Sequence, residues 1–389
     1  MTKTISTLLL FIVALTLRAQ PFEVSGVVYV DTNENDVQES NEKGLPNVVV
    51  SDQLNTTLTA ADGSYHLVND TDRNLLFISQ PSGYAGTFSR PKFDKVDFPL
   101  KKTRHQSTFS FIHASDTHID SLNLPRMIRF REMVDSIDVD FVIITGDLIR
   151  DALRVSAPIA SNYYLMYRSE IAKFKIPVYS SPGNHELFGI ERDKSMVSEQ
   201  HPLYGRKMFQ HFLGPNYYSF NYGGLHFIAL DGVEYQDQWY YGGIDEDQLT
   251  WLENDLNYVS QKTPIVTFNH IPFVSTGFTF QPFEPQDFYG PQLMAQKGKL
   301  AHRHIIYNFE KVQQILRNRP YPLALSGHYH AAQESSIQGS GTLFAQTSAI
   351  TRPDRFNYNG FKMRSGFTLY QVHDGSIVQH TFIPLNLPD

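Results

Sequence analysis

The sequence contains no cysteine, so disulfide bonds, thiolate metal sites and a cysteine nucleophile are excluded. It also has no excess of positive charge: 33 lysine and arginine residues stand against 40 aspartate and glutamate residues, for a formal net charge of −7. Because a general nucleic-acid binder normally presents a basic face, we expect no nucleic-acid binding. The hydrophobic content of 41% is instead typical of a folded protein. The length of 389 residues is enough for two or three domains.

Long apolar runs are also scarce, and the one that stands out lies at the N-terminus. Lys3 supplies a positive charge, residues 7–17 form an apolar core, and Ala19 is a small residue at a plausible cleavage point. Residues 1–20 are therefore predicted to be a secretory signal peptide, since the run is shorter than the roughly 20 residues that span a bilayer. Arg18 is atypical beside a cleavage point and leaves an uncleaved anchor as the alternative. We expect a secreted, periplasmic or cell-surface protein whose mature chain has no membrane span.

Two different patterns follow the signal peptide. Residues 21–100 contain short β-branched runs and an Asp62-Gly63 turn signal, which predict a small all-β sandwich domain. Residues 89–104 carry prolines and several basic residues and are predicted to be a linker. From residue 101 to residue 389, apolar strand-like runs alternate with amphipathic segments, which is typical of an α/β domain.

The small domain carries one motif, an acidic loop at residues 31–42. Its side-chain oxygens occupy positions 1, 3, 5, 9 and 12 of a twelve-residue calcium loop: Asp31, Asn33, Asn35, Glu39 and Glu42. The loop departs from that pattern at Asp36, where glycine normally makes the sharp bend. It resembles the loops of calcium-binding β-sandwich repeats in bacterial surface proteins, which implies a structural calcium ion. The alternative is a solvated acidic loop between two strands.

Polar motifs follow five short apolar runs in the large domain. They are Asp116-x-His118, Gly146-Asp147, Gly183-Asn184-His185-Glu186, Asn269-His270 and Gly327-His328-x-His330. If the runs are neighbouring strands, their ends meet at one rim, where the ligand sites of α/β sheets commonly lie. The sequence therefore predicts that these polar side chains converge.

The chemistry of the converging groups indicates a metal centre. They comprise two carboxylates, an amide oxygen and several imidazoles, and this mixture suits divalent manganese, iron or zinc better than a calcium cage. Two such ions and one hydroxide, set against two carboxylates, leave about one positive charge. That charge favours an anionic phosphoryl group as the ligand.

In this order the motifs resemble those of the calcineurin-like metallophosphoesterases, of a secreted type with an N-terminal β-sandwich domain. The resemblance covers about residues 108–385 and implies a four-layer α/β/β/α sandwich with two metals. It implies the following ligands: Asp116, His118, Asp147 and His330 for one metal, and Asp147, Asn184, His270 and His328 for the other, with Asp147 bridging. It also implies that His185 is catalytic, stabilising the transition state or protonating the leaving oxygen. The implied reaction is in-line attack on phosphorus by a metal-bridging hydroxide.

The class of ester stays open at this point. Purple acid phosphatases carry a tyrosine three residues after the bridging aspartate, and Arg150 at this position argues against a ferric-tyrosinate centre. The segment from Asn269 to Pro272 is closer to the class III cyclic-nucleotide phosphodiesterases. A phosphomonoesterase and a phosphodiesterase of cyclic-nucleotide or glycerophosphodiester type both fit the same residues. A surface-binding protein that has lost catalysis is a further alternative, but the complete set of ligands argues against it.

Substrate contacts are predicted from less specific signals. Arg150, Asp151 and Arg154 closely follow the bridging aspartate and are expected to reach the phosphate; a solvated surface face is the alternative. The long segment 271–307 contains Phe273, Phe278 and Phe280, whose rings would stack on a phosphorylated small molecule or a glycan-like or lipid-like substrate. The alternative is that this segment packs its own aromatic rings over the core.

Further polar residues lie near the motifs. Glu186 is expected to orient a metal ligand or a loop rather than to bind a metal itself. His302 and His304 are expected to be ordinary surface or core histidines, with a role in assisting the site as the alternative.

Overall fold

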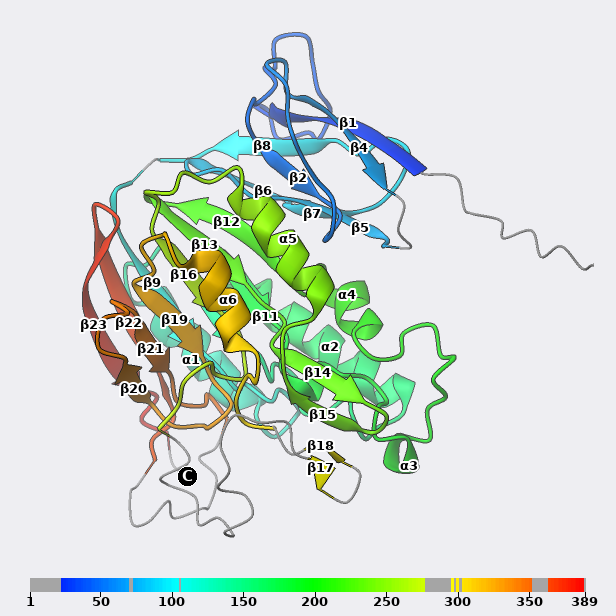
Figure 1. The fold of residues 1–389 in the computed structure, drawn as a ribbon, viewed down its shortest axis with the longest axis vertical. Coiled ribbons are helices and arrows are strands. Elements are labelled where there is room, and N and C mark those ends of the chain that lie inside the picture. Colours follow the sequence, from blue (N-terminus) through cyan, green and yellow to red (C-terminus); the bar gives the residue numbers. More distant parts are fainter. Residues whose placement is uncertain are drawn as a thin grey trace, which may run out of the picture.

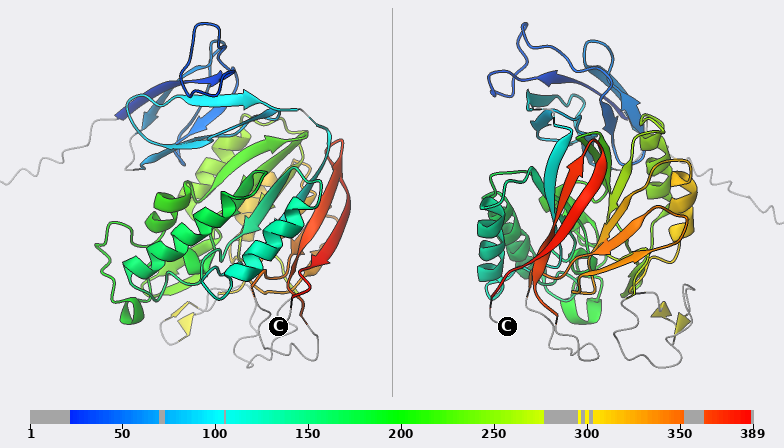
Figure 2. Two further views of the ribbon diagram at one scale, coloured as in Figure 1. Left: turned by 180° about the vertical axis from the view of Figure 1, so that it is seen from behind. Right: turned by 90° about the vertical axis from the view of Figure 1, so that its left-hand side faces the viewer.

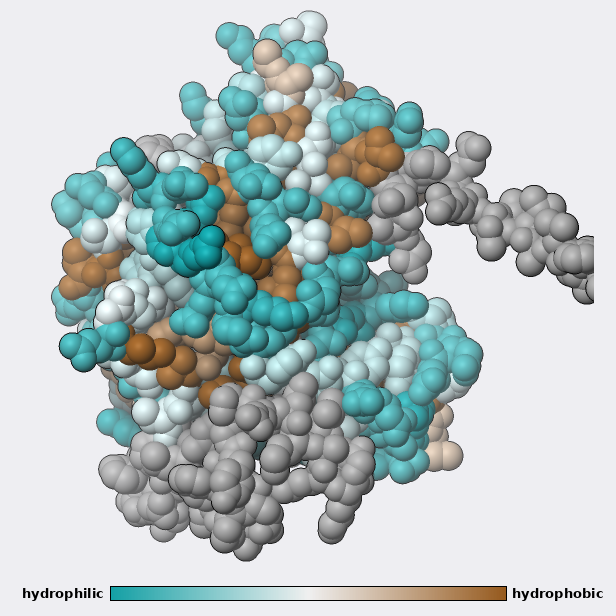
Figure 3. Space-filling view, viewed as in Figure 1, coloured by the Kyte–Doolittle hydropathy of each residue, from teal (hydrophilic) through white to brown (hydrophobic). Residues whose placement is uncertain are grey.

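The computed structural model describes residues 22–69, 73–104, 106–276, 295–296, 299–300, 303–351 and 363–387, and the statements below concern these residues. The predicted signal peptide, residues 1–20, lies outside them. Within the described ranges, no helix is both long and apolar enough to span a membrane. The face in Figure 3 is largely hydrophilic, with apolar residues gathered in small separate patches.

The N-terminal part of the chain forms the predicted all-β domain, which is built from two four-stranded sheets (Figure 1). The first sheet has the strand order β4 (Ser64–Asn69), β1 (Phe22–Val30), β8 (Phe98–Lys102) and β6 (Tyr84–Gly86). The second has the order β3 (Thr56–Leu58), β2 (Val49–Ser51), β5 (Leu75–Ile78) and β7 (Ser89–Pro91). Val28, Val50 and Ile78 belong to the core that the two sheets share.

The prediction of a linker at residues 89–104 is wrong. These residues form β7 and β8, and β8 pairs in parallel with β1. Phe98 and Leu100 are fully buried in the core of the domain. The free energy gained by burying these two side chains fixes the strand, although the prolines and the exposed lysines around it suggested a flexible connection.

The large domain contains two sheets packed face to face. The first has the order β11 (Val178–Ser181), β10 (Phe141–Thr145), β9 (Thr108–Ala114), β22 (Gly366–His373) and β23 (Ser376–Pro384). The second has the order β12 (Tyr218–Tyr222), β13 (Leu225–Ala229), β16 (Ile265–Phe268), β19 (Leu323–Ser326), β21 (Leu343–Gln346) and β20 (Gln333–Ser336). Strands β9, β10 and β11 run parallel to one another, as do β13, β16, β19 and β21. The carboxyl ends within each parallel set therefore lie at the same edge.

Helices cover the outer faces of both sheets, which gives the predicted four-layer α/β/β/α sandwich (Figure 2). On the first sheet lie α1 (Leu124–Asp135), α2 (Ala157–Ile171) and α4 (Lys207–Leu213). On the second lie α5 (Glu246–Leu256) and α6 (Phe309–Leu316). Short elements complete the domain: η1 (Asn184–Glu186), α3 (Arg192–Ser195), the hairpin of β14 (Val233–Gln236) and β15 (Trp239–Gly242), and the pair β17 (Ala295–Gln296) and β18 (Lys299–Leu300).

Alternation along the strands explains these layers. In β10, Phe141 and Ile143 belong to the core between the sheets, whereas Val142 and Ile144 pack against the helices. Successive side chains of a strand point to opposite faces, so a continuous apolar run is required when both faces are covered. The runs β10, β16 and β19 that precede polar motifs are therefore buried on both faces, whereas β11 is half-buried and lies at the edge of its sheet.

The two domains share a packed interface. Phe77 of β5 is buried against Trp251 of α5, with ring centroids 6.0 Å apart. Gln53 donates hydrogen bonds to Asn216 and to the carbonyl of Tyr217, at 3.1 and 3.2 Å. The β domain therefore lies on the end of the large domain near the start of β12, and its position is fixed by buried contacts.

Candidate metal centre

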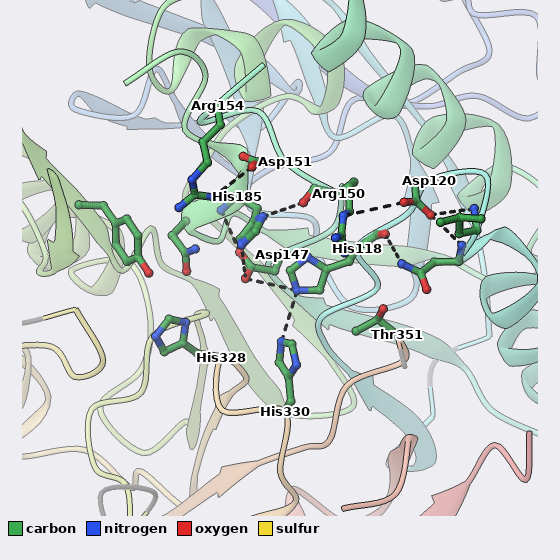
Figure 4. Close-up of a pocket in the computed structure, with 14 residues that line it drawn as sticks. His118, Asp120, Asp147, Arg150, Asp151, Arg154, His185, His328, His330 and Thr351 are labelled. Atoms are coloured by element: carbon green, nitrogen blue, oxygen red, sulfur yellow. Dashed lines mark hydrogen bonds and ion pairs between the residues drawn. The ribbon is translucent and has the colours of Figure 1, made fainter. Parts of the chain in front are cut away.

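The predicted metal-site residues lie just beyond the carboxyl ends of five strands. Strands β9, β10 and β11 of the first sheet are followed by Asp116 and His118, by Asp147, and by Asn184 and His185. Strands β16 and β19 of the second sheet are followed by His270, and by His328 and His330. Both sheets end at the same rim, and the labelled side chains in Figure 4 point into one pocket there. The predicted convergence is confirmed.

The first group of ligand atoms comes from Asp116, His118 and His330. Asp116 Oδ1 lies 3.1 Å from His330 Nε2 and 3.9 Å from His118 Nε2. The two imidazole Nε2 atoms are 3.3 Å apart. These three side chains therefore surround a space that a single cation could share.

The second group comes from Asp147, His270 and His328. Asp147 Oδ2 lies 3.2 Å from His270 Nε2, and His270 Nε2 lies 3.1 Å from His328 Nδ1. Asp147 Oδ2 is also 3.6 Å from Nε2 of His118 in the first group. Asp147 thus belongs to the second group and also lies close to the first, which is the position predicted for a bridging ligand.

The backbone is unusual at five of these residues. Left-handed φ angles occur at Asp116 (53°), His118 (39°), Asp147 (47°), His328 (73°) and His330 (53°). Non-glycine residues rarely adopt such angles, which cost of order 1–3 kcal/mol each and cluster at functional sites. The surrounding fold therefore holds these side chains in orientations that a relaxed loop would not keep.

Two glycines in the motifs allow the loops to approach the ligands closely. A Cβ atom on Gly183 would lie 2.3 Å from Asp147 Oδ1, and one on Gly327 would lie 1.8 Å from Ser115 Oγ. Either contact is too short for a real side chain, so glycine is required at both positions.

Hydrogen bonds to backbone carbonyls orient two of the imidazoles. His270 Nδ1 lies 2.8 Å from the carbonyl oxygen of Thr145, and His185 Nδ1 lies 2.7 Å from that of Arg150. A carbonyl only accepts, so each Nδ1 carries the proton. Nε2 of each ring is turned toward Asp147, at 3.2 Å for His270 and 3.8 Å for His185.

The electrostatics of the site favour a cation beside Asp147. Burial would raise the pKa of Asp147, but His270 and His185 lower it well below its ordinary value. Burial, followed by the nearby His185, lowers the pKa of His118 to about 3. Burial and His270 also hold the pKa of His328 well below its usual range. His270 is the exception: burial would lower its pKa, but the charges of Asp147 and Asp116, with the hydrogen bonds to Asp147 and Thr145, together raise it to about 9.

The donor set fits divalent transition metals. Carboxylates and neutral imidazoles are the forms in which these side chains bind metals; His118 and His328 already favour the neutral form, and a metal ion would displace the second proton of His270. Asn184 Oδ1 is buried and has no hydrogen-bond partner within the described ranges. A buried carbonyl oxygen without a partner is costly, and a metal ligand bond would satisfy it.

Glu186 connects the loops that carry the ligands, as predicted. Its Oε1 accepts hydrogen bonds from the backbone N–H groups of Leu148 and Ile149, at 2.8 and 3.1 Å. Its Oε2 accepts one from Gly183, at 2.6 Å. Burial, with the nearby negative charge of Asp147, raises the pKa of Glu186 to about 8. Glu186 therefore ties the loop after β10 to the loop after β11.

A cavity of about 580 Å³, shown in Figure 4, is lined by five of the proposed ligands: His118, Asp147, Asn184, His328 and His330. Arg150, predicted to contact substrate, lies in its wall, and its Nε is 3.9 Å from Asp120 Oδ2. Its side chain is 56% exposed, so the guanidinium has room to turn toward a ligand. Tyr240 and Thr351 also line the cavity and were not predicted, because no local motif marks them.

Phe273, which was predicted to contact the substrate, is instead buried. Phe273 is 4% exposed and stacks on Phe309 of α6, with ring centroids 4.4 Å apart. It belongs to the core between the second sheet and its helices and is not among the residues that line the cavity. Its placement matches the alternative of a ring packed over the core. Phe278 and Phe280 lie outside the described residues.

The acidic loop of the β domain is closed by its own hydrogen bonds. Asp31 Oδ1 accepts from the N–H of Glu34 at 2.7 Å, and Glu42 Oε1 accepts from the N–H of Thr32 at 2.6 Å. Asn33 and Asn35 turn their amide groups to one oxygen of Glu39, at 3.3 and 2.6 Å.

The acidic loop makes the sharp bend of a calcium loop without the usual glycine. Asp36 adopts a φ of 61°, the left-handed angle for which glycine is usual. Each group of at least three histidine, aspartate or glutamate ligand atoms found among the described residues lies in the large domain. Calcium binding in the loop stays a prediction.

Two family models match this chain. The family model of calcineurin-like phosphoesterase matches residues 109–332, and that of the N terminal of calcineurin-like phosphoesterase matches residues 31–113. No curated protein matches the chain significantly. A dimetal phosphatase from Danio rerio is 15% identical, with a TM-score of 0.45 over 72% of this chain and 99% of that one. Purple acid phosphatase PPD1 from yellow lupin (Lupinus luteus) seeds is 14% identical, with a TM-score of 0.47 over 94% and 67%.

Proposed function

The chain belongs to the calcineurin-like phosphoesterase family, and we propose that it hydrolyses phosphoric esters with two divalent metal ions. The observation that carries this proposal is the position of Asp147 between two groups of ligand atoms, with His118 on one side and His270 on the other. One metal ion would be held by Asp116, His118, Asp147 and His330. The other would be held by Asp147, Asn184, His270 and His328.

The bound ions would supply the positive charge that activates a water molecule and offsets the negative charge growing on the phosphoryl group. Manganese, iron and zinc all suit the mixture of oxygen and imidazole ligands. The ligand side chains fix the positions of the two ions. Five of the ligands have constrained backbone angles, and Glu186 ties two of the ligand loops together. A site organised in advance does not have to be rearranged during the reaction.

His185 is proposed to be the general acid that protonates the leaving oxygen. Its Nδ1–H donates to the Arg150 carbonyl, which leaves Nε2 facing Asp147 and the cavity. When Nε2 is protonated, it can donate to the oxygen of the departing alcohol as the ester bond breaks. Arg150, in the same wall, is proposed to bind a phosphate oxygen through its guanidinium.

The substrate is proposed to be a phosphorylated small molecule or a glycan-like or lipid-like phosphate ester. Monoesters and diesters would use the same residues, so the phosphodiesterase reading stands as the alternative. A binding protein without catalysis is disfavoured, because every predicted ligand is present and the side chains of both groups converge.

A panel of substrates tests this function. Metal-stripped protein would be supplied in turn with manganese, zinc, iron and magnesium, and assayed on an aryl phosphate and a bis-aryl phosphate. We expect metal-dependent hydrolysis of at least one, and the ratio of the two rates distinguishes a monoesterase from a diesterase. If no metal restores activity on either compound, the proposed hydrolase is wrong.

Two accompanying proposals concern the localisation of the protein and a calcium site in the β domain. Residues 1–20 support a secreted or periplasmic protein, through their charged start and apolar core. The spacing of residues 31–42 supports a structural calcium ion in the β domain, separate from catalysis.

A further inference from the structure

His304 contacts a proposed metal ligand directly. Its Nδ1 lies 2.8 Å from Nε2 of His328, and the two ring centroids are 5.0 Å apart. The other nitrogen of His328, Nδ1, lies 3.1 Å from His270 Nε2 and so faces the second group of ligand atoms. Both nitrogens of His328 are therefore engaged, one by the proposed metal site and one by His304.

The segment that carries His304 is held in place on both sides. After it, the N–H of Ile306 donates to the carbonyl of Pro272 at 3.0 Å, and the N–H of Tyr307 donates to that of Gly242 at 3.2 Å. Gly242 ends β15, and a Cβ there would lie 2.3 Å from the carbonyl oxygen of Ile305, so this approach is close.

Before His304, the side chain of Arg303 is held between two rings. Its guanidinium carbon lies 3.7 Å from the ring centroid of Trp239 and 4.0 Å from that of Tyr240. Such cation–π contacts add to the hydrogen bonds that follow in the chain. The imidazole of His304 is thus presented to His328 by a fixed backbone.

We propose that His304 is a positioning residue for the second metal, the one assigned to Asp147, Asn184, His270 and His328. With Nδ1 of His328 turned to the metal, its Nε2 carries the proton and donates to His304 Nδ1. This hydrogen bond fixes the tautomer and the ring orientation of His328, as outer partners of metal-bound histidines do. The inference rests on the proposed two-metal function.

The proposal makes the two metal sites unequal. In the second site, His270 is oriented by the Thr145 carbonyl and His328 by His304. In the first site, the buried Nδ1 of His118 has no hydrogen-bond partner in the described part of the chain. The second site is therefore better organised in advance and is expected to bind its metal more tightly.

The test is the binding of zinc or manganese to metal-stripped protein, followed by calorimetry and by elemental analysis after dialysis. Wild type is expected to bind two equivalents with unequal affinities. His304→Ala is expected to weaken the tighter class by about 10- to 100-fold and to leave the other class unchanged. His211→Ala, which removes an exposed histidine from α4, is the control for the loss of an imidazole.

Two further variants test whether His304 acts through its hydrogen bond to His328 or only by filling space. In His304→Asn the side-chain oxygen can take the place of Nδ1, so most of the affinity should be kept. In His304→Gln the oxygen lies one bond farther out, and binding should resemble that of the alanine variant. Circular dichroism of the stripped proteins checks that each is folded.

The possible results separate this inference from the function on which it rests. Two equivalents in wild type with unchanged affinities in His304→Ala, or equal losses in the asparagine and glutamine variants, would overturn the role of His304 alone. Clearly fewer than two equivalents in wild type would instead overturn the two-metal function.

Discussion

Asp147 Oδ2 and His270 Nε2 lie 3.2 Å apart, although the two residues follow strands of different sheets. Asp147 comes after β10 of the first sheet and His270 after β16 of the second. Their contact exists only because the two sheets pack face to face with their carboxyl ends at one rim. The site is thus a product of the sandwich, and each sheet contributes part of both proposed metal positions.

The role of His185 can be separated from that of the ligands. His185→Ala is expected to lower kcat by about 10²- to 10⁴-fold, because the leaving oxygen loses its proton donor. Metal content should stay at the wild-type level, since His185 is assigned to no metal. Steady-state kinetics and elemental analysis on the same samples check this, with His270→Ala as the variant that should lose metal. A loss of one metal from His185→Ala would show that His185 is a ligand.

Phe273 is expected to act on stability and not on substrate choice. It is buried and stacked on Phe309, so Phe273→Ala should lower the free energy of unfolding by about 3–5 kcal/mol. Denaturant unfolding measures this loss. The ratio of kcat/KM for a bulky and a small phosphate ester should be that of wild type. An unchanged stability together with a lost preference for the bulky ester would restore the substrate-binding role.

The acidic loop gives the protein a pH dependence of known sign. The backbone N–H of Thr32 is the main cause that lowers the pKa of Glu42 from 4.5 to about 2. A carboxyl group with a lowered pKa stabilises the fold above its unfolded pKa and loses that contribution as the pH falls toward the folded one. Glu42→Gln should therefore have a lower Tm than wild type at neutral pH, and the difference should narrow between about pH 4.5 and 2.

Thermal unfolding over this range checks the role of Glu42, with the exposed Glu34→Gln as control. A difference in Tm that is the same at every pH would contradict it. Calcium added at neutral pH should raise the Tm of wild type more than that of Glu42→Gln if the loop binds the ion.

The ligand positions could be predicted because each one carries its signal locally. A short apolar run predicts a buried strand, and the motif that follows it places Asp147 or His328 at the carboxyl end. Parallel strands then bring the ends together within each sheet, and the face-to-face packing of the two sheets brings both sets of ends to one rim. The four-layer arrangement follows from the resemblance that these same motifs carry.

Features that depend on distant contacts could not be predicted in this way. Phe98 is a core residue because β8 pairs with β1, about 70 residues earlier, and the prolines and lysines around it give the opposite local signal. Phe273 is buried by a helix that lies later in the chain. His304 reaches His328 only because β15 holds its segment, and nothing in the residues around it indicates that pairing.

The most direct test of the account is the metal content and activity of wild type beside Asp147→Asn. Wild type is expected to hold about two transition-metal ions per chain and to hydrolyse a phosphate ester. Asp147→Asn should retain less than one ion and lose at least about 10²-fold in kcat while it stays folded. The exposed Asp138→Asn should match wild type in both measurements. An Asp147→Asn protein that keeps two metals and full activity would contradict the bridging role on which the proposed function depends.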